Sequence, residues 1–413
     1  SVEFISLLRL RFTMSGGWSR FALRFSRYYA SLSASDLWTP PRLRNREWMF
    51  IQWGDKPVDR HRGFTSEESL LSYLQQRGPH SSFHSTAYYR KPMERKMADK
   101  DWLGADLIFD LDGDHLPGVS DADFPSMIEL IQEQAWSLWN DFLEPEFDMK
   151  REFAQFTFSG HRGFHIHVRD PNLMGLDSNA RREIVSYIRG EGLEVNTILT
   201  GPDSGWRNRI EIGTQSVVEK LRVIGNKSEG YRQILDEFYE LLNKNIVNGS
   251  QRGTSKNKIT SLAESVLSDE RIERLASDSN LAVFGKETPI FWDLVKQDKS
   301  VVLGTAGETD ENVTVDIKRV IRHLGSLHGK CGLRVTEIPF ERLDPDGYNP
   351  FNPLLESVAF TSSEKSEIRL VQDDVTASLL GTEVSGSRGD TFHVSEALSV
   401  FLCLKGWGEM VGP

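Results

Sequence analysis

Hydrophobic residues recur along the chain with two spacings, one typical of helices and one typical of strands. Helical spacing predicts helices over residues 18–32, 66–76, 126–142, 179–188 and 394–404. Runs of β-branched and aromatic residues predict strands over residues 48–53, 105–112, 153–158 and 164–168, near 208–213, and over 312–317. Because both kinds of element alternate through the sequence, we expect an α/β fold.

The alternation of predicted helices and strands stops between residues 229 and 300, where the sequence predicts charged helical segments instead. The most regular of these segments are Tyr231 to Leu242 and Ile259 to Leu275. No group of chemically active residues gathers there, so we interpret this stretch as a mainly helical, solvated insertion. We therefore expect a core built from residues 15–228 and 301–413, interrupted by an insertion over 229–300.

The strand predicted over residues 105–112 carries two aspartates. Side chains two residues apart on a strand share a face, so Asp110 and Asp112 project together while Phe109 and Leu111 pack inward. Two ionised carboxylates side by side repel each other, and a divalent cation such as Mg²⁺ or Mn²⁺ is the usual reason to keep both charged. The alternative is an exposed strand end that leads into an aspartate-rich turn.

Two strands, over residues 153–158 and 164–168, flank a short turn and predict a tight hairpin. The turn combines two glycines with three hydrogen-bond donors: Ser159, Gly160, His161, Arg162 and Gly163. Glycines allow close backbone approach, which favours a turn that faces phosphate. On the second strand His165 and His167 share one face, and a polar face is a more frequent explanation for such a pair than a zinc site.

A third segment places a carboxylate, Asp316, at the end of the strand predicted over 312–317. A run rich in cations and hydroxyls follows and includes Arg322, Ser326, His328 and Lys330. This arrangement suits a third metal ligand beside a clamp for a triphosphate. A basic helix start explains the same residues without any ligand.

Two further basic segments lie nearer the N-terminus. Arg42, Arg44 and Arg46 are spaced by two residues, which on an extended segment would place three guanidinium groups on one face, toward phosphate or toward solvent. Residues 85–97 form a predicted loop that combines tyrosines with arginines and lysines and leads directly to the acidic strand.

Composition narrows the class of protein. The chain has 413 residues, a formal net charge of −11 and a mean hydropathy of −0.40, so it is not a protein whose whole surface binds nucleic acid, and a polyanion must meet a local basic patch. No apolar run is long enough to span a membrane. Cys331 and Cys403 are the only cysteines and offer neither a disulfide framework nor a cysteine zinc site, so we expect a protein of the reducing cytoplasm. We interpret Met14 as a possible true start.

In this order, the three motifs resemble the signature motifs of the catalytic small subunit of archaeal and eukaryotic DNA primases, with the archaeal branch the closer match. The motifs are the segments 110–112, 159–165 and 316–330. Further likeness lies in residues 45–50, 84–89 and 102–107. The resemblance implies the archaeo-eukaryotic primase type of catalytic core, with a mixed β-sheet.

The resemblance also assigns roles by matching position. It implies that Asp110, Asp112 and Asp316 hold the catalytic Mg²⁺ or Mn²⁺ ions. It implies that the incoming nucleotide and its phosphates are bound by Arg46, Ser159, His161, Arg162, His165, Arg322, Ser326, His328 and Lys330. Family members usually carry a zinc module between the first two motifs, but residues 116–155 contain no cysteine here, so we do not expect structural zinc.

The activity implied by the resemblance is template-directed synthesis of short primers from nucleoside triphosphates on single-stranded DNA for replication. The implied partner is a large primase subunit that carries an iron–sulfur cluster, in a nucleoid-associated heterodimer. A stand-alone primase-polymerase used in repair or by a mobile element would need the same motifs. A non-catalytic scaffold would be expected to lack a metal carboxylate or the basic clamp, and metal-dependent phosphodiester hydrolysis would not explain that clamp.

Overall fold

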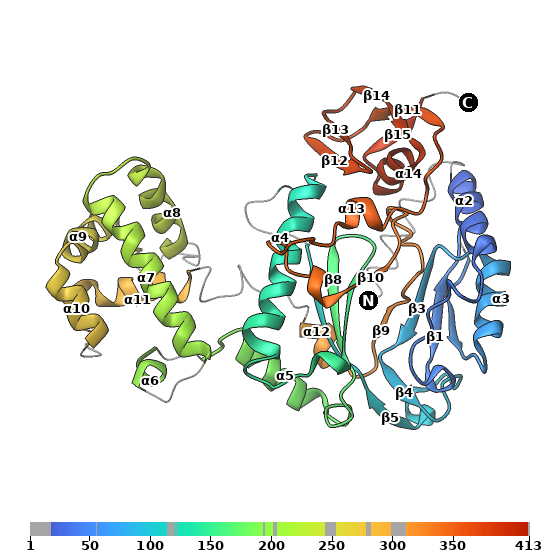
Figure 1. Ribbon diagram of the computed structural model, residues 1–413, viewed down its shortest axis with the longest axis horizontal. Helices are drawn as coiled ribbons and strands as arrows, with labels where there is room; N and C mark the ends of the chain where they lie inside the picture. The colour runs from blue at the N-terminus through green and yellow to red at the C-terminus, as the bar shows by residue number, and fades with distance from the viewer. Residues whose placement is uncertain are drawn as a thin grey trace. The chain divides into compact units, whose positions relative to one another are not determined.

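The computed structural model describes residues 18–54, 56–113, 120, 122–192, 195–200, 205–243, 253–277, 282–298 and 311–411. The chain divides into two compact units (Figure 1). The α/β unit comprises Ser1–Trp136, Met149–Val185 and Glu308–Pro413, and the helical unit comprises Ser137–Asp148 and Ser186–Gly307. The boundaries of the insertion expected from the sequence, 229–300, stay a prediction.

One sheet of the α/β unit has the strand order β2-β1-β3-β9. Its strands are β1 (Trp48–Ile51), β2 (Asp59–Arg62), β3 (Ser81–Ser85) and β9 (Val320–Arg322), all paired antiparallel. Two helices, α2 (Trp18–Ser31) and α3 (Glu67–Arg77), pack beside it (Figure 1). Helix α3 begins at a capping box formed by Ser66 and Ser69, which satisfies backbone N–H groups that the helix leaves unpaired.

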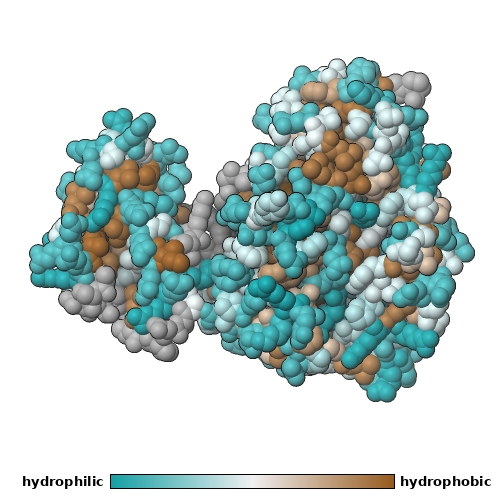
Figure 2. Space-filling model, in the orientation of Figure 1, coloured by the Kyte–Doolittle hydropathy of each residue, from teal (hydrophilic) through white to brown (hydrophobic). Residues whose placement is uncertain are grey.

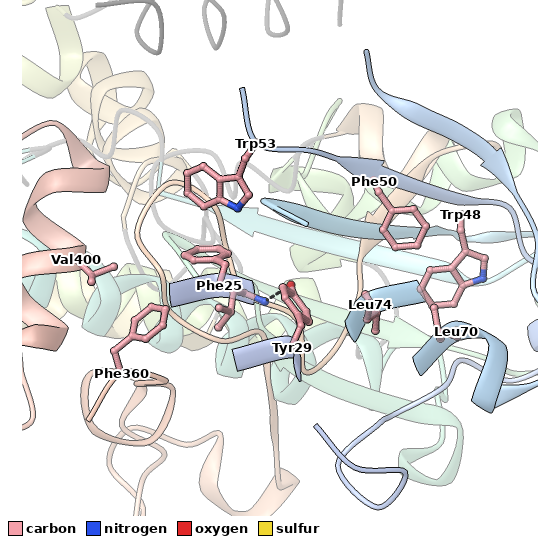
Figure 3. Close-up of a cluster of buried hydrophobic side chains, with 10 residues drawn as sticks. Phe25, Tyr29, Trp48, Phe50, Trp53, Leu70, Leu74, Phe360 and Val400 are labelled. Atoms are coloured by element: carbon pink, nitrogen blue, oxygen red, sulfur yellow. Dashed lines mark hydrogen bonds between the residues drawn. The ribbon is translucent and has the colours of Figure 1, made fainter. Parts of the chain in front are cut away.

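A hydrophobic cluster joins these helices to the sheet (Figure 3). The fully buried rings of Phe25 and Tyr29 come from α2, and those of Trp48 and Phe50 come from β1. The Phe25 and Trp53 rings meet edge to face with centroids 4.9 Å apart. The Tyr29 hydroxyl accepts a hydrogen bond of 3.1 Å from the Leu327 N–H (dashed in Figure 3), so this core also anchors the segment that follows β9.

A second sheet of this unit has the order β10-β7-β8-β6 and carries the acidic strand. Its strands, again all antiparallel, are β6 (Leu107–Asp112), β7 (Ala154–Phe158), β8 (Gly163–Val168) and β10 (Thr336–Ile338). Helix α4 (Phe124–Leu138) packs close to the end of β6, because a Cβ at Gly113 would lie 2.5 Å from Ile131. The predicted acidic strand and the hairpin are confirmed.

The other described helices and strands of the α/β unit lie outside these two sheets, and their strands form three smaller sheets. They are β4 (Ala87–Tyr89), β5 (Trp102–Ala105), α12 (Glu311–Val315), α13 (Pro353–Glu356), β11 (Lys365–Leu370), β12 (Val375–Leu379), β13 (Thr382–Gly386), β14 (Thr391–Ser395), α14 (Glu396–Lys405) and β15 (Gly408–Met410). Helix α5 spans Ser178–Ile188. Strand β4 pairs with β5, β12 with β13, and β11 with both β14 and β15.

The described part of the helical unit contains α6 (Val195–Thr200), α7 (Gly205–Gly225), α8 (Tyr231–Asn243), α9 (Lys256–Val266), α10 (Asp269–Ser277) and α11 (Thr288–Lys296). Its core lies where α7 and α9 approach, since a Cβ at Gly225 would lie 2.8 Å from the Ala263 carbonyl oxygen. Hydrophilic residues cover most of the visible face of each unit (Figure 2). No described helix combines the length and the apolar character needed to cross a membrane.

Three element predictions were wrong. Residues 208–213, predicted as a strand, lie inside α7, where Trp206, Ile210, Val217 and Leu221 are buried at helical intervals. The predicted helical segment 259–275 is two helices, since α9 ends at Val266 and α10 begins at Asp269. Residues 312–317, predicted as a strand, fall largely in α12.

Tertiary contact explains the last of these errors. The Thr314 hydroxyl of α12 donates a 2.7 Å hydrogen bond to the Ile108 carbonyl of β6, and Val313 clusters with Ile108 and Ile321. Packing of this kind overrides the strand preference of valine and threonine.

The expectations for the sheet type and for the basic segments also need correction. Every ladder between named strands in the described residues is antiparallel, where we expected a mixed sheet. The predicted loop 85–97 contains the short strand β4. Arg42 has a left-handed φ of 57°, so the chain turns there; Arg42 and Arg44 are exposed while Arg46 is fully buried, and the three do not share one face.

Candidate active site

The acidic strand brings two carboxylates to one face at the end of β6. Asp110 lies opposite His165 of β8 in the ladder, and its Oδ1 is 3.2 Å from the His165 Nε2. Asp112 lies two residues on and is half-buried, with its Oδ1 3.9 Å from the Arg162 Nε. The alternation of the strand and its pairing with the hairpin therefore place a carboxylate pair beside a histidine and an arginine.

The two carboxyl groups have pKa shifts in opposite directions. Burial works to raise the pKa of Asp110, but the hydrogen-bonded His165 and the cations Arg319 and Arg322 bring it below its usual value. Loss of solvent and the neighbouring charge of Asp110 raise the pKa of Asp112. The pair thus repels itself when ionised, and added positive charge at this point would stabilise it.

Oxygen donors of this kind fit a hard divalent cation such as Mg²⁺ or Mn²⁺. Asp316, the third predicted ligand, is exposed and follows α12, and its Oδ1 accepts a 2.9 Å hydrogen bond from the Lys318 N–H. No group of three or more His, Cys, Asp or Glu residues in the described ranges is arranged to hold a metal ion. The structure brings the pair together, and the role of Asp316 as a third ligand stays a prediction.

The turn of the hairpin is fixed by its own hydrogen bonds and by its glycines. The Ser159 Oγ accepts from the Gly163 N–H at 3.1 Å, so this hydroxyl stabilises the turn. Gly160 has a φ of +83°, and a Cβ there would lie 3.0 Å from the His328 Cβ. A Cβ at Gly163 would lie 2.7 Å from the Leu111 carbonyl oxygen of β6. Gly160 thus lets the turn pack on the third motif, and Gly163 lets it lie close to the acidic strand.

His161 of the turn meets the third motif. Its ring stacks on that of His328 with centroids 4.8 Å apart and an interplanar angle of 19°. Burial lowers the pKa of both rings well below the usual value, and nearby cations, among them Arg322 and Lys330, lower it further. Both imidazoles are therefore neutral at pH 7 and able to donate a hydrogen bond without adding charge.

Arg322 of β9 is half-buried, with one nitrogen of its guanidinium enclosed by the protein. It lies over the Phe83 ring at 4.8 Å, and its Nη1 is buried with no hydrogen-bond partner among the described residues. Burial lowers the pKa of Arg322 to about 10, although Asp110 and Asp112 act in the opposite direction. A buried charged donor without an acceptor is costly, and an anionic ligand would satisfy it.

The remaining residues of the third motif are held within the fold. The Ser326 hydroxyl donates to the His323 carbonyl at 2.6 Å. The Lys330 N–H donates to the His328 Nδ1 at 3.2 Å, and the Lys330 charge acts on the pKa of Asp112. These contacts link the cationic segment to both the histidine pair and the carboxylates.

Arg46 has a different environment from the other predicted ligands. Its fully buried guanidinium donates to the carbonyls of Pro41, Ser85 and Thr86 and to the Asp106 carboxylate, which lies 2.9 Å away. Its fork thus connects three segments of the fold around β6. A direct contact of Arg46 with a nucleotide stays a prediction.

Two cations near the site were not among the predicted residues. Arg319 lowers the pKa of Asp110. The sequence could have indicated Arg319 as a site residue, because it belongs to the basic run after Asp316. The Lys405 Nζ of α14 lies 3.1 Å from the His161 Nε2 and 4.3 Å from the centre of the Trp407 ring. No sequence signal indicates Lys405, since α14 lies far from the motifs along the chain.

Comparison with known proteins agrees with this geometry. The sequence model of the DNA primase small subunit family matches residues 109–339, which include all three motifs. The chain is 34% identical to the DNA primase small subunit PriS of Methanothrix thermoacetophila, over 94% of this chain and 97% of that protein. It is 33% identical to PriS of Methanocella arvoryzae, over 91% of this chain and 92% of the relative. PriS of Methanosarcina barkeri is also 33% identical, over 94% and 95% of the two chains.

These matches cover both units and leave little of either sequence unmatched. They confirm the resemblance seen in the three motifs, including the likeness to the archaeal branch. The chain belongs to the DNA primase small subunit family, the catalytic subunit of DNA primase.

Proposed function

We propose that the α/β unit catalyses template-directed synthesis of short primers from nucleoside triphosphates on single-stranded DNA. The observation that carries this proposal is the carboxylate pair Asp110 and Asp112 within electrostatic reach of Arg322, whose buried Nη1 has no hydrogen-bond partner in the described residues. Metal-binding carboxylates beside a site for a polyanion are what nucleotidyl transfer requires. In this proposal the core has the archaeo-eukaryotic primase type of fold, built from residues 15–228 and 301–413 around the helical insertion 229–300.

Asp110, Asp112 and Asp316 hold Mg²⁺ or Mn²⁺ in this proposal, in line with the divalent-metal dependence that the family implies. When bound, such ions activate the attacking 3′-hydroxyl and stabilise the leaving pyrophosphate. The chain's own contribution is position. His165 holds the Asp110 carboxylate by its 3.2 Å contact, and the β6–β8 ladder fixes the spacing of the two aspartates.

The phosphates of the nucleotide are bound by cations and neutral donors. Arg322 and Lys330 supply positive charge from the third motif, and Arg162 supplies it from the turn. Neutral His161 and His328 donate hydrogen bonds, with Ser159 and Ser326 ordering the two segments. An oxygen of the triphosphate gives the Arg322 Nη1 the acceptor that it lacks within the described residues.

The name of the family implies a large subunit as partner. We infer that this partner carries the iron–sulfur cluster and that the heterodimer acts on the nucleoid in the cytoplasm. The two cysteines of this chain are too few for a four-thiolate cluster, so the cluster belongs to the partner.

A primer-synthesis assay tests the proposal. Wild type, Asp110→Asn and Asp112→Asn are compared on single-stranded DNA with labelled nucleoside triphosphates and Mg²⁺ or Mn²⁺, with and without the large subunit. Both substitutions keep the shape of the site and remove one charge, and we expect at least a ~100-fold loss of product. Asp373→Asn, which changes an exposed carboxylate 3.7 Å from the Arg388 Nε, is the matched control. Full activity of the two site variants would overturn the proposal.

A further inference from the structure

A cavity of about 780 Å³ lies in the α/β unit, lined by residues of α3, of the segment before it and of the loop after β4. None of its lining residues belongs to the carboxylate, hairpin or Arg322 sites described above. It is lined by three cations, Arg44, Arg90 and Lys91, and by the apolar side chains of Phe64, Tyr73 and Met93. This volume is in the range of pockets that hold a nucleotide-sized ligand.

The charge of the cavity is opposite to that of the chain. The chain carries a net charge of −11, yet the only acidic side chain lining this cavity is Glu94, against three cations. Lys91 is exposed and has no ion-pair partner in the described ranges, so its charge is available to a ligand. Arg90 pairs with Asp101 at 2.7 Å on the exposed surface, where such a pair stabilises the fold little.

The third cation is held in place. The Arg44 Nε donates to the Thr65 carbonyl at 2.9 Å, and this leaves the other end of the guanidinium fork for an acceptor. The loop that supplies Arg90 and Lys91 continues with Arg95 and Lys96, both exposed. The positive charge therefore extends beyond the cavity, as a binding site for a chain of phosphates requires.

The other wall of the cavity is built from the aromatic rings of Phe64 and Tyr73 and the thioether of Met93. Phe64 packs on Tyr73 with centroids 5.6 Å apart, and the Tyr73 hydroxyl donates to Asp59, which fixes the tyrosine. Met93 is 65% exposed and its Cγ would lie 3.0 Å from a Cβ at Gly63, so the thioether lies against the backbone near Phe64. Such flat, polarisable surfaces bind the faces of nucleobases.

We propose that this cavity binds the single-stranded DNA template, with its backbone phosphates on Arg44, Arg90 and Lys91 and a base against Phe64 and Met93. The proposal rests on the proposed function, because it names where the template of that reaction is held. A polynucleotide fits better than a free nucleotide, since the cations of the loop continue past the cavity to Lys96.

The first test measures binding of a fluorescently labelled oligo(dT) to the full chain by anisotropy, over a series of salt concentrations. We expect Lys91→Ala to weaken binding several-fold at low salt and to reduce the slope of log K against log salt by about 0.7, the value for one lost phosphate contact on a single strand. The Lys91 side chain makes no hydrogen bond or ion pair within the described residues, so we expect this variant to fold. Lys365→Ala, an exposed lysine of β11, is the matched control and keeps wild-type binding.

A second test locates the contact. An oligonucleotide that carries 5-iododeoxyuridine is irradiated with the wild-type chain, and the cross-linked peptides are identified by mass spectrometry. We expect cross-links within residues 63–94, with Met93→Ala reducing their yield.

Several results would overturn the proposal. They are undetectable binding by wild type, unchanged affinity and slope in Lys91→Ala, an equal loss in Lys365→Ala, cross-links confined to other segments, or an acidic peptide that competes as well as unlabelled oligo(dT). The two proposals fail separately. If Asp110→Asn loses primer synthesis but Lys91→Ala binds oligo(dT) as wild type does, only the proposal of a template site is wrong. If Asp110→Asn stays active, the proposed catalytic site is wrong whatever the binding data show.

Discussion

At the scale of the residue, Arg322 combines a positive charge with a buried nitrogen that lacks an acceptor. Its guanidinium lies over the Phe83 ring, and its buried Nη1 has no hydrogen-bond partner within the described residues. Replacing a buried, unsatisfied charge by an apolar group of similar length is often neutral or stabilising. The contact with Phe83 and the attraction of Asp110 and Asp112 offset this cost in part, so we expect Arg322 to contribute little to the stability of the free protein.

This leads to a prediction in which stability and activity separate. We expect Arg322→Met to have a melting temperature close to that of wild type, because the cost of the unsatisfied Nη1 offsets the attraction of Asp110 and Asp112. We also expect it to bind nucleoside triphosphate at least ~10-fold more weakly, because a charge-assisted hydrogen bond is lost. Thermal unfolding and a nucleotide titration measure the two effects. A large fall in melting temperature with unchanged nucleotide binding would show that Arg322 is a structural residue.

Single residues were predictable from the sequence where a local rule placed them. Alternation along β6 was enough to put Asp110 and Asp112 on one face. Lys405 and the enclosed position of Arg46 were not predictable, because each depends on contacts between segments far apart in the chain. Asp316 shows the same limit, since its surroundings depend on how α12 packs against β6.

At the scale of the element, the hairpin holds the acidic strand in place by pairing β8 with β6. Gly163 pairs with Asp112 across the β6–β8 ladder, and the approach of the strands leaves no room for a side chain there. The position of Asp112 thus depends on a residue with no chemistry of its own.

We predict that Gly163→Ala destabilises the chain by about 1–3 kcal/mol, the usual range for overpacking, because the new Cβ would lie 2.7 Å from the Leu111 carbonyl oxygen. Primer synthesis should fall with it, since the carboxylate pair is displaced. Gly175→Ala is the control, because a Cβ there meets nothing within 4 Å. Equal melting temperatures for both variants would contradict this account of the turn.

Elements with a strong local pattern were predicted correctly, and weakly patterned ones were not. The β7–β8 hairpin follows from alternation around a glycine-flanked turn. The helix α12 has strand-forming residues, and only its packing on β6 makes it helical.

At the scale of the whole molecule, buried histidines couple the fold of the α/β unit to pH. Burial lowers the pKa of His80 to about 3 and that of His323 to about 4. His323 lies between β3 and the segment of Trp38, with its Nε2 2.8 Å from the Trp38 carbonyl oxygen. In the unfolded chain the same rings take up protons near pH 6.5.

The sign of the effect follows from these values. Below pH 6.5 the unfolded chain binds more protons than the folded chain, so the free energy of unfolding is greatest above that pH and falls between pH 6.5 and about 4. His323 alone should remove about 2 kcal/mol by pH 5. We expect His323→Asn to show a smaller fall in melting temperature between pH 7 and pH 5 than wild type; an identical fall would contradict the buried, neutral state of this ring.

The division of the chain into an α/β unit and a helical unit could be anticipated only in outline. Charged residues at helical spacing indicated a helical segment over 229–300, but the helical unit also includes Ser137–Asp148 and residues before 229. The limits of each unit depend on which helices pack together, and packing of this kind is not a local feature of the sequence.

The central claim is that the carboxylate pair on β6 and the cations around Arg322 form one site for a divalent metal and a triphosphate. Titration of Mn²⁺ followed by electron paramagnetic resonance, with and without nucleoside triphosphate, tests it most directly. We predict that wild type and Asp373→Asn bind Mn²⁺ more tightly when the nucleotide is present, and that Asp110→Asn and Asp112→Asn lose most of this binding. Equal Mn²⁺ binding by all four proteins would contradict the account.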